Sequence, residues 1–182
     1  VLATVAKEFH AKGWDVRLAA PTASATKQLE DAIGRDNCSG ACTVQKFLID
    51  QKKIQEPEVQ GRQKLWIIDE SSMLGTRQMN ELLKHAEKQN AKVLLVGDVK
   101  QIASIEAGKA FGQLQEAGMR TSILDHIVRQ KNPQLLAGVE AAAKGEMRNA
   151  LEKVEQAGGI VEAQSEQNKM EEVISRAAQH YL

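Results

Sequence analysis

The stretch KLWIIDESSMLG, Lys64 to Gly75, decides how the rest of this 182-residue chain is interpreted. In it, four bulky apolar residues, Leu65–Ile68, are followed directly by two adjacent carboxylates, Asp69 and Glu70. A continuous apolar run is typical of a strand that is buried on both faces, as in a parallel sheet covered by helices. The stretch therefore predicts a core strand that ends in a doubled negative charge, and the rest of the chain must explain that charge.

Helical and strand-like segments alternate on both sides of this stretch. Apolar runs predict four strands, at Trp14–Ala20, Leu65–Asp69, Ala91–Asp98 and Arg120–Gln130. Periodicity and capping residues predict helices between them, at Val1–Lys12, Ser24–Gly34, Thr43–Lys53, Thr76–Gln89 and Ala107–Gly118. Gly34–Cys42 is interpreted as a loop. The alternation predicts an α/β fold with a doubly wound parallel sheet.

The sequence changes character after Gln130. Asn132–Gln156 is rich in alanine and helical in pattern, Gly158–Gln164 predicts a brief strand, and Glu166–Leu182 predicts a final helix. We therefore divide the chain into a sheet domain, residues 1–130, and a mostly helical bridge towards a further domain, residues 131–182.

The composition narrows the class of protein. Lys and Arg together number 24, as do Asp and Glu, so no basic excess suggests a protein that passively coats DNA. Cys38 and Cys42 have no second Cys/His pair to complete a metal site, and we interpret them as two reduced thiols. No apolar run approaches the roughly 18 residues of a membrane span, and we expect a cytoplasmic protein without a membrane partner.

Polar residues follow each predicted strand, where open α/β sheets bind their ligands. These residues are Pro21 and Thr22, Asp69 and Glu70, Gly97, Asp98 and Gln101, and Arg129. An acidic pair at a strand end suits a magnesium ion that bridges two phosphates of a nucleotide, with Asp69 holding the ion. Glu70 would then orient or deprotonate the attacking water. The alternative is a solvated acidic turn after a core strand.

For each of the other strand ends, one interpretation is a role in ligand binding and the other is a purely structural role. Gly97 frees the backbone at a crowded position, and the amide of Gln101 can touch a γ-phosphate or a water, although this segment also suits an ordinary turn. Arg129 offers a permanent positive charge to a phosphate, or is a surface arginine. Pro21 and Thr22 place a helix N-terminus where a backbone phosphate could bind, or only cap that helix. No phosphate loop of the form G-x-x-x-x-G-K-[ST] occurs in the sequence.

Together and in this order, the segments resemble the first motor domain of RecD-like superfamily 1 DNA helicases. They are LAAPTASATKQL (motif Ia), ACTVQKFLID (a threonine-led DNA-contact segment), LWIIDESSMLG (motif II), VLLVGDVKQIASIEAGKAF (motif III) and LDHIVRQ (motif IV). The DESSM, GD…Q…G…F and IVRQ segments are most similar to the helicase parts of TraI/TrwC-type conjugative relaxases. The resemblance covers Ala19 to Gln130 and implies a RecA-like sheet, with residues 131–182 leading to the second motor domain.

The resemblance implies a role for each matching residue. Asp69 would bind magnesium, Glu70 would activate water, and Gln101 and Arg129 would contact the γ-phosphate of ATP. Gly97 and Asp98 would belong to the nucleotide site. Pro21, Thr22 and Thr43 would contact the backbone of single-stranded DNA. Many relatives carry histidine where this chain has Gln45, which departs from the pattern beside Thr43.

The resemblance also implies that the Walker A residues precede Val1, so that the chain is a piece of a longer polypeptide. The parent would be an ATP- and magnesium-dependent DNA helicase with 5′-to-3′ polarity that acts in conjugative plasmid transfer, with a relaxase domain as a further part. Two alternatives stay open. One is a degenerate, helicase-derived DNA-binding or scaffolding domain without ATPase activity, and the other is a RecD-like subunit of a repair exonuclease.

Overall fold

A computed structural model describes residues 1–54, 61–99, 109–124 and 132–160 of the chain. Its helices are α1 (Leu2–Ala11), α2 (Ala23–Ile33), α3 (Val44–Lys52), α4 (Thr76–Lys88), α5 (Ala110–Glu116), α6 (Pro133–Ala143) and α7 (Met147–Gln156), with short 3₁₀ turns η1 (Arg35–Asn37) and η2 (Ser71–Met73). Its strands are β1 (Asp15–Ala20), β2 (Gly40–Thr43), β3 (Lys64–Ile68) and β4 (Ala91–Leu95).

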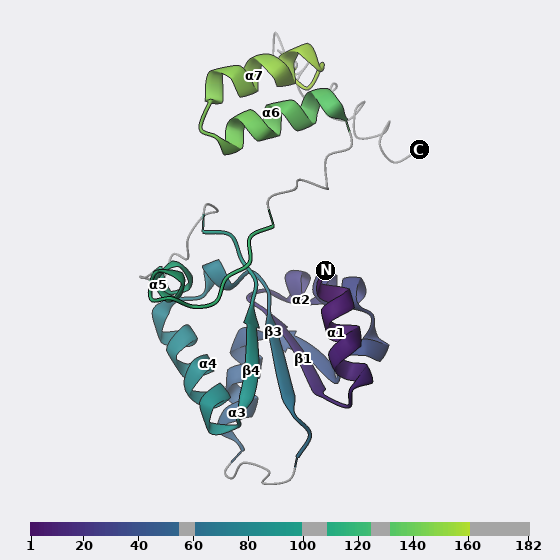
Figure 1. Cartoon of the computed structure of the whole chain (residues 1–182), viewed down its shortest axis with the longest axis vertical. Coiled ribbons are helices and arrows are strands. Elements are labelled where there is room, and N and C mark those ends of the chain that lie inside the picture. Colours follow the sequence, from purple (N-terminus) through teal and green to yellow (C-terminus); the bar gives the residue numbers. More distant parts are fainter. Residues whose placement is uncertain (55–60, 100–108, 125–131, 161–182) are drawn as a thin grey trace, which may run out of the picture. The chain divides into compact units, whose positions relative to one another are not determined.

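The four strands form one parallel sheet in the order β2-β1-β3-β4 (Figure 1). The register places Leu18 of β1 opposite Ile67 of β3, and Ile67 opposite Leu94 of β4. Each connection between neighbouring parallel strands passes through a helix, as such crossovers require. The predicted α/β class with a parallel sheet is confirmed.

Side chains of β3 alternate between two hydrophobic clusters, one on each face of the sheet. Trp66 and Ile68 pack with residues of α3, α4 and α5, where the rings of Phe47 and Trp66 meet edge to face with centroids 4.8 Å apart. Leu65 and Ile67 pack with residues of α1 and α2 on the other face. The continuous apolar run of β3 is explained by this burial on both faces.

One predicted loop is partly wrong. Gly34–Cys42 was expected to be irregular, but Gly40–Thr43 forms β2, which pairs with β1 from Arg17 to Ala20. The sequence GACT has no run of large β-branched or aromatic residues, so local propensity gives no strand signal. The backbone of β1 supplies the pairing that defines this strand.

Two further predictions are wrong, one of a strand and one of a helix cap. The strand predicted over Arg120–Gln130 is not formed in its described part, Arg120–Leu124, and the rest of that segment lies outside the described residues. Helix α2 is capped by Thr22, whose Oγ1 accepts a hydrogen bond from the Ala25 amide at 3.1 Å, and not by Ser24. The predicted end at Gly34 is confirmed by its positive φ of 87°.

The chain divides into two compact units, Val1–Thr121 and Ser122–Leu182. The boundary predicted between residues 130 and 131 lies within the range 125–131, which the structure does not describe. In the second unit the predicted helix over Asn132–Gln156 is two helices, α6 and α7, because Gly145 reverses the chain with a φ of 83°. Gly158–Ile160, the described part of the predicted brief strand, is not a strand.

Close helix contact holds α6 and α7 together. A Cβ atom at Gly138 of α6 would lie only 2.8 Å from Cγ2 of Val154 in α7. Glycine therefore permits this approach, and any larger side chain would push the helices apart.

Among the described residues, no helix is long and apolar enough to cross a membrane.

The two cysteines are free and belong to different clusters. Cys42 packs with the cluster of Trp66, whereas Cys38 packs with the cluster of Leu18 on the other face. Burial raises the pKa of both thiols above the ordinary value. Both thiols are therefore protonated at neutral pH and weakly nucleophilic.

Candidate functional site

The carboxyl ends of β1, β3 and β4 meet at one edge of the sheet, and backbone hydrogen bonds tie these ends together. The Asp69 amide donates to the Ala19 carbonyl at 2.9 Å, and the Val96 amide donates to the Ile68 carbonyl at 2.8 Å. β2 ends at the same edge, since Thr43 lies opposite Ala20. The structure therefore brings seven predicted site residues to this edge, namely Pro21, Thr22, Thr43, Asp69, Glu70, Gly97 and Asp98.

Asp69 is half-buried at the end of β3. Its Oδ1 accepts a hydrogen bond from the backbone amide of Glu70 at 2.9 Å. Within the described part of the chain this is the one hydrogen bond of the carboxylate that the geometry provides. The second oxygen therefore remains available to a cation or to water.

Glu70 has a left-handed backbone, with φ 50° and ψ 38°. This conformation is uncommon for a residue with a long side chain, and it turns the chain sharply out of β3. The Glu70 carbonyl then accepts from the Met73 amide at 2.9 Å, which closes the turn η2. The two acids are thus adjacent in sequence, and the backbone turns sharply at the second of them.

Ser71 anchors this turn to two strands. Its hydroxyl donates to the Ile68 carbonyl at 2.8 Å, and its amide donates to the Val96 carbonyl at 2.7 Å. The side chain is fully buried. Sequence reasoning missed Ser71 as a supporting residue, and the only available signal was a small polar residue directly after the acidic pair.

Gly97 lies against the same turn. A Cβ atom there would stand 2.9 Å from the Ser72 amide nitrogen and 3.2 Å from the Ser71 amide nitrogen. Real Cβ atoms do not approach backbone atoms this closely, so only glycine fits. This steric role agrees with the crowded strand end predicted from the sequence, while contact of Gly97 or Asp98 with a nucleotide stays a prediction.

The predicted DNA-contact threonines are both helix caps. Thr22 caps α2, and Thr43 caps α3, where its Oγ1 accepts from the Lys46 amide at 3.3 Å. Thr22 is exposed, and Pro21 beside it is half-buried. Each hydroxyl uses a lone pair in its cap and keeps its own proton to donate. Capping therefore does not preclude contact with a phosphate.

Two predicted site residues lie outside the described part of the chain. These are Gln101 and Arg129, which fall in the ranges 100–108 and 125–131. Their proposed contacts with the γ-phosphate stay predictions.

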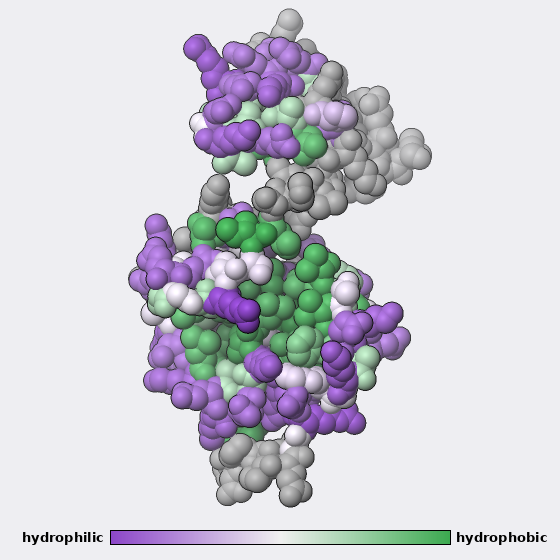
Figure 2. Space-filling view, viewed as in Figure 1, coloured by the Kyte–Doolittle hydropathy of each residue, from purple (hydrophilic) through white to green (hydrophobic). Residues whose placement is uncertain are grey.

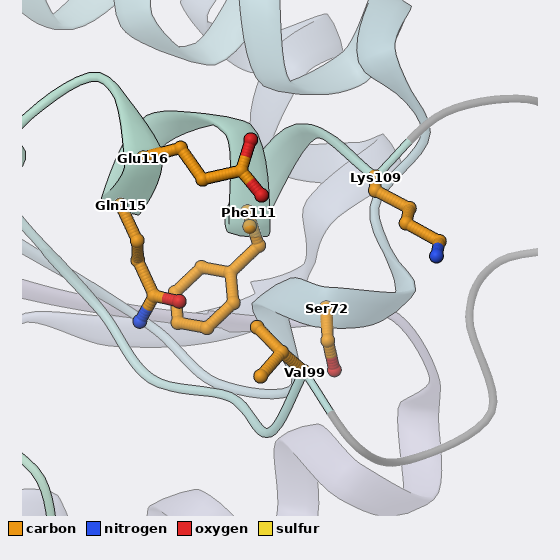
Figure 3. A pocket seen from close by; sticks show the side chains of 7 residues that line it. Ser72, Val99, Lys109, Phe111, Gln115 and Glu116 are labelled. Carbon is orange, nitrogen blue, oxygen red and sulfur yellow. The ribbon is translucent and has the colours of Figure 1, made fainter.

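A cavity of about 270 Å³ lies next to the turn, between η2 and α5 (Figure 3). Val99 and Phe111 give it an apolar side, and Lys109, Gln115 and Glu116 carry the polar groups around it. Ser72 contributes to the same wall. The cavity therefore adjoins the acidic strand end without including the two acids.

Apolar side chains also gather on the face of the sheet unit where β3 and β4 lie (Figure 2). Val93, Leu94, Leu95 and Val96 are only partly buried, because β4 is an edge of the described sheet.

The sequence of this chain is similar to a family of known domains and to several known proteins. A profile of the AAA domain family matches residues 1–165. The ATP-dependent RecD2 DNA helicase of Deinococcus radiodurans is 35% identical over 156 residues, which are 81% of this chain and 21% of that protein. The conjugal transfer protein TraA of Rhizobium radiobacter is 33% identical over 87 residues, 48% of this chain and 8% of the relative.

A second conjugal transfer protein TraA, from Agrobacterium fabrum, is 29% identical over 94 residues, 52% of this chain and 8% of the relative. The chain thus spans about a fifth of the length of the helicase and less than a tenth of the conjugal transfer proteins. The resemblance to RecD-like helicases, first drawn from the motifs, is confirmed by these similarities. The chain therefore belongs to the AAA domain family, as a RecD-like motor domain related to those of helicases and conjugal transfer proteins.

Proposed function

We propose that this chain is part of the motor of an ATP-dependent DNA helicase, which couples hydrolysis of Mg-ATP to movement along single-stranded DNA. The observation that carries the proposal is the pair Asp69–Glu70 at the carboxyl edge of the parallel sheet, braced against β4 through Ser71. Similarity to a protein named ATP-dependent RecD2 DNA helicase supports it.

The residues at this edge fit a magnesium ion. Mg²⁺ prefers oxygen ligands and usually takes one or two carboxylates, with water and phosphate oxygens filling the other positions. Asp69 offers one carboxylate oxygen that no described residue occupies. A bound magnesium ion would neutralise developing charge on the phosphates.

In this proposal Glu70 orients the attacking water and accepts a proton from it. The left-handed turn directs the backbone of Glu70 away from the line of β3, so that its carboxylate need not share the position of Asp69. If both acids bound the ion, neither would be free to act as a base. The turn therefore supports a division of labour in which Asp69 holds the cation and Glu70 orients the attacking water.

The threonine caps suit the backbone of single-stranded DNA. Thr22 and Thr43 precede α2 and α3, and the N-terminus of a helix favours a phosphate through its free amides and its dipole. Pro21 would shape the chain beside Thr22. We propose these three residues as DNA contacts, and Gly97, Asp98, Gln101 and Arg129 as part of the nucleotide site.

The remaining features of the proposal extend the motif resemblance to the whole polypeptide. We propose that the chain is a piece of a longer cytoplasmic polypeptide that supplies a Walker A segment and the second motor domain. Residues 1–130 would belong to the first motor domain, and residues 131–182 would lead to the second. Similarity to two conjugal transfer proteins favours a role in conjugal transfer. We add 5′-to-3′ polarity and a relaxase domain to the proposal on the motif resemblance alone.

The test is hydrolysis of ATP by the complete polypeptide, with and without single-stranded DNA. Wild type should be stimulated by DNA. Glu70→Gln should still bind nucleotide but lose hydrolysis by roughly 10²–10⁴-fold, the usual contribution of a positioned base. Glu87→Gln, which changes an exposed glutamate of α4, should behave like wild type.

Two outcomes would contradict the proposal. Hydrolysis by Glu70→Gln at the wild-type rate would remove Glu70 from the reaction. If wild type binds DNA but never hydrolyses ATP, the protein is a helicase-derived scaffold and the motor function is wrong.

A further inference from the structure

The turn that follows Asp69 contains two unfavourable features within three residues. Glu70 is left-handed, and among the described residues Asn90 is the other non-glycine residue with a positive φ. Asparagine adopts this conformation more readily than glutamate does. The hydroxyl oxygen of Ser72 is sealed from solvent and has no hydrogen-bond partner in the described part of the chain. Strain of this kind gathers at functional sites.

The neighbouring serine shows how unusual this is. Ser71 is fully buried, but its hydroxyl and its amide both have partners, the carbonyls of Ile68 at the end of β3 and of Val96 just after β4. The turn is thus fixed at Ser71 and unsatisfied at Ser72. Since buried polar groups are nearly always paired, the unpaired hydroxyl needs an explanation.

Among the described residues, Ser72 has Gly97 on one side and a cavity on the other. Gly97 closes one side, because a Cβ there would already lie 3.4 Å from the Ser72 Oγ. The other side is the cavity, where the side chains of Val99, Lys109 and Phe111 lie around Ser72 (Figure 3). Packed protein interiors resist movement, whereas a cavity gives a side chain space for a second position.

We propose that Ser72 is a positioning residue of the nucleotide site, whose hydroxyl gains a hydrogen bond only when a magnesium nucleotide binds at Asp69 and Glu70. The inference rests on the proposed function. A nucleotide at these acids acts directly on the strained turn, and Ser72 is two residues from Glu70. The unpaired donor destabilises the nucleotide-free arrangement, so a ligand that allows pairing binds more tightly by the same amount.

The experiment compares Ser72→Ala with wild type in the complete polypeptide. Without nucleotide, Ser72→Ala removes an unpaired buried hydroxyl and should raise the thermal midpoint by about 2–4 °C. Its affinity for a non-hydrolysable magnesium–ATP analogue should fall roughly 5- to 150-fold, because the bound state loses a hydrogen bond. A purely structural role would change the thermal midpoint without this loss of affinity.

Three variants make the comparison sharp. Ser71→Ala removes a paired hydroxyl and should lower the thermal midpoint, the opposite of Ser72→Ala. Ser39→Ala, which changes an exposed serine before β2, should alter neither quantity. Ser72→Thr keeps the hydroxyl, its methyl group can enter the cavity, and it should restore most of the affinity.

Each other result overturns the inference. A lower midpoint for Ser72→Ala means that the hydroxyl is already paired without nucleotide. A higher midpoint with unchanged affinity means that it stays unpaired with nucleotide. If wild type itself does not bind the analogue, the proposed function fails and this inference fails with it. Binding by wild type therefore distinguishes failure of the proposed function from failure of this inference alone.

Discussion

At the scale of single residues, the acidic strand end depends on a contact that neither acid makes. Gly97 fits against the amides of Ser71 and Ser72 only because it has no side chain. The absence of a side chain leaves room for the turn in which Glu70 is left-handed. The position of the two charged residues therefore depends on a neutral residue that lies just after a different strand.

Gly97→Ala should damage both stability and hydrolysis. A Cβ at 2.9 Å from the Ser72 amide forces the turn away from β4, and overpacking of this kind costs about 1–3 kcal/mol. The free energy of unfolding, measured by denaturant titration, should fall by that amount, and DNA-stimulated hydrolysis should fall with it.

Gly112→Ala is the matched control. A Cβ at Gly112 would meet only Val99 Cγ1, at an ordinary 3.8 Å, within α5. Alanine favours helices over glycine by about 1 kcal/mol, so this variant should be as stable as wild type or more stable. Equal effects of the two substitutions would contradict the steric argument.

At the scale of elements, the helix starts at the strand ends combine a structural and a proposed binding role. The cap of α2 by Thr22 and the cap of α3 by Thr43 orient both helix N-termini at the edge where β1, β2 and β3 end. The two roles can be separated because replacing a capping threonine with glycine lowers stability only slightly, whereas replacing it with alanine lowers stability more.

Thr22→Ala should destabilise the protein by about 0.5–2 kcal/mol, and Thr22→Gly by only a few tenths. If the hydroxyl contacts DNA, both variants should bind a single-stranded oligonucleotide more weakly and to a similar extent, while the salt dependence of binding should stay as in wild type because no charge is removed. Thr22→Ser, which keeps cap and hydroxyl, should bind as wild type does. Wild-type affinity in Thr22→Gly would limit Thr22 to capping.

At the scale of the whole molecule, each of the two units has its own packing, and the titratable groups of the sheet unit link its stability to pH. Burial lowers the pKa of His85 on α4, and the nearby Lys52 lowers it further, while Glu81 acts in the opposite direction. The folded state therefore favours the neutral imidazole. A histidine of this kind stabilises the fold above its unfolded pKa of about 6.5, and that contribution is lost as the pH falls towards the lower folded pKa.

His85→Gln should weaken this dependence on pH. Between pH 7 and pH 5 the thermal midpoint of wild type should fall more than that of the variant, since glutamine cannot be protonated. The exposed ion pair of Lys53 and Asp50 offers a control, because Lys53→Gln should leave the pH profile of wild type unchanged. A steeper profile in His85→Gln would show that the sign is wrong.

The sequence by itself determined the elements whose signal is local. The apolar run of β3 is buried on both faces, the periodic faces of α1 and α4 form helices, and Gly13 and Gly34 end their helices with positive φ. The acidic pair and the order of the motifs also indicate the family without any knowledge of the geometry. Periodicity and turn chemistry act between near neighbours in the chain, so these features can be read from it.

Tertiary structure decided what depends on partners distant in sequence. β2 is a strand because the backbone of β1 pairs with it, and GACT carries no strand signal of its own. Ser71 supports the acidic turn through a hydrogen bond to Val96, just after β4, and Gly97 lies against the same turn. The sequence indicated a crowded position at Gly97, but not which segment crowds it. The physical reason is the same in each case: hydrogen bonds and steric limits between separate segments exist only once the sheet has brought those segments together.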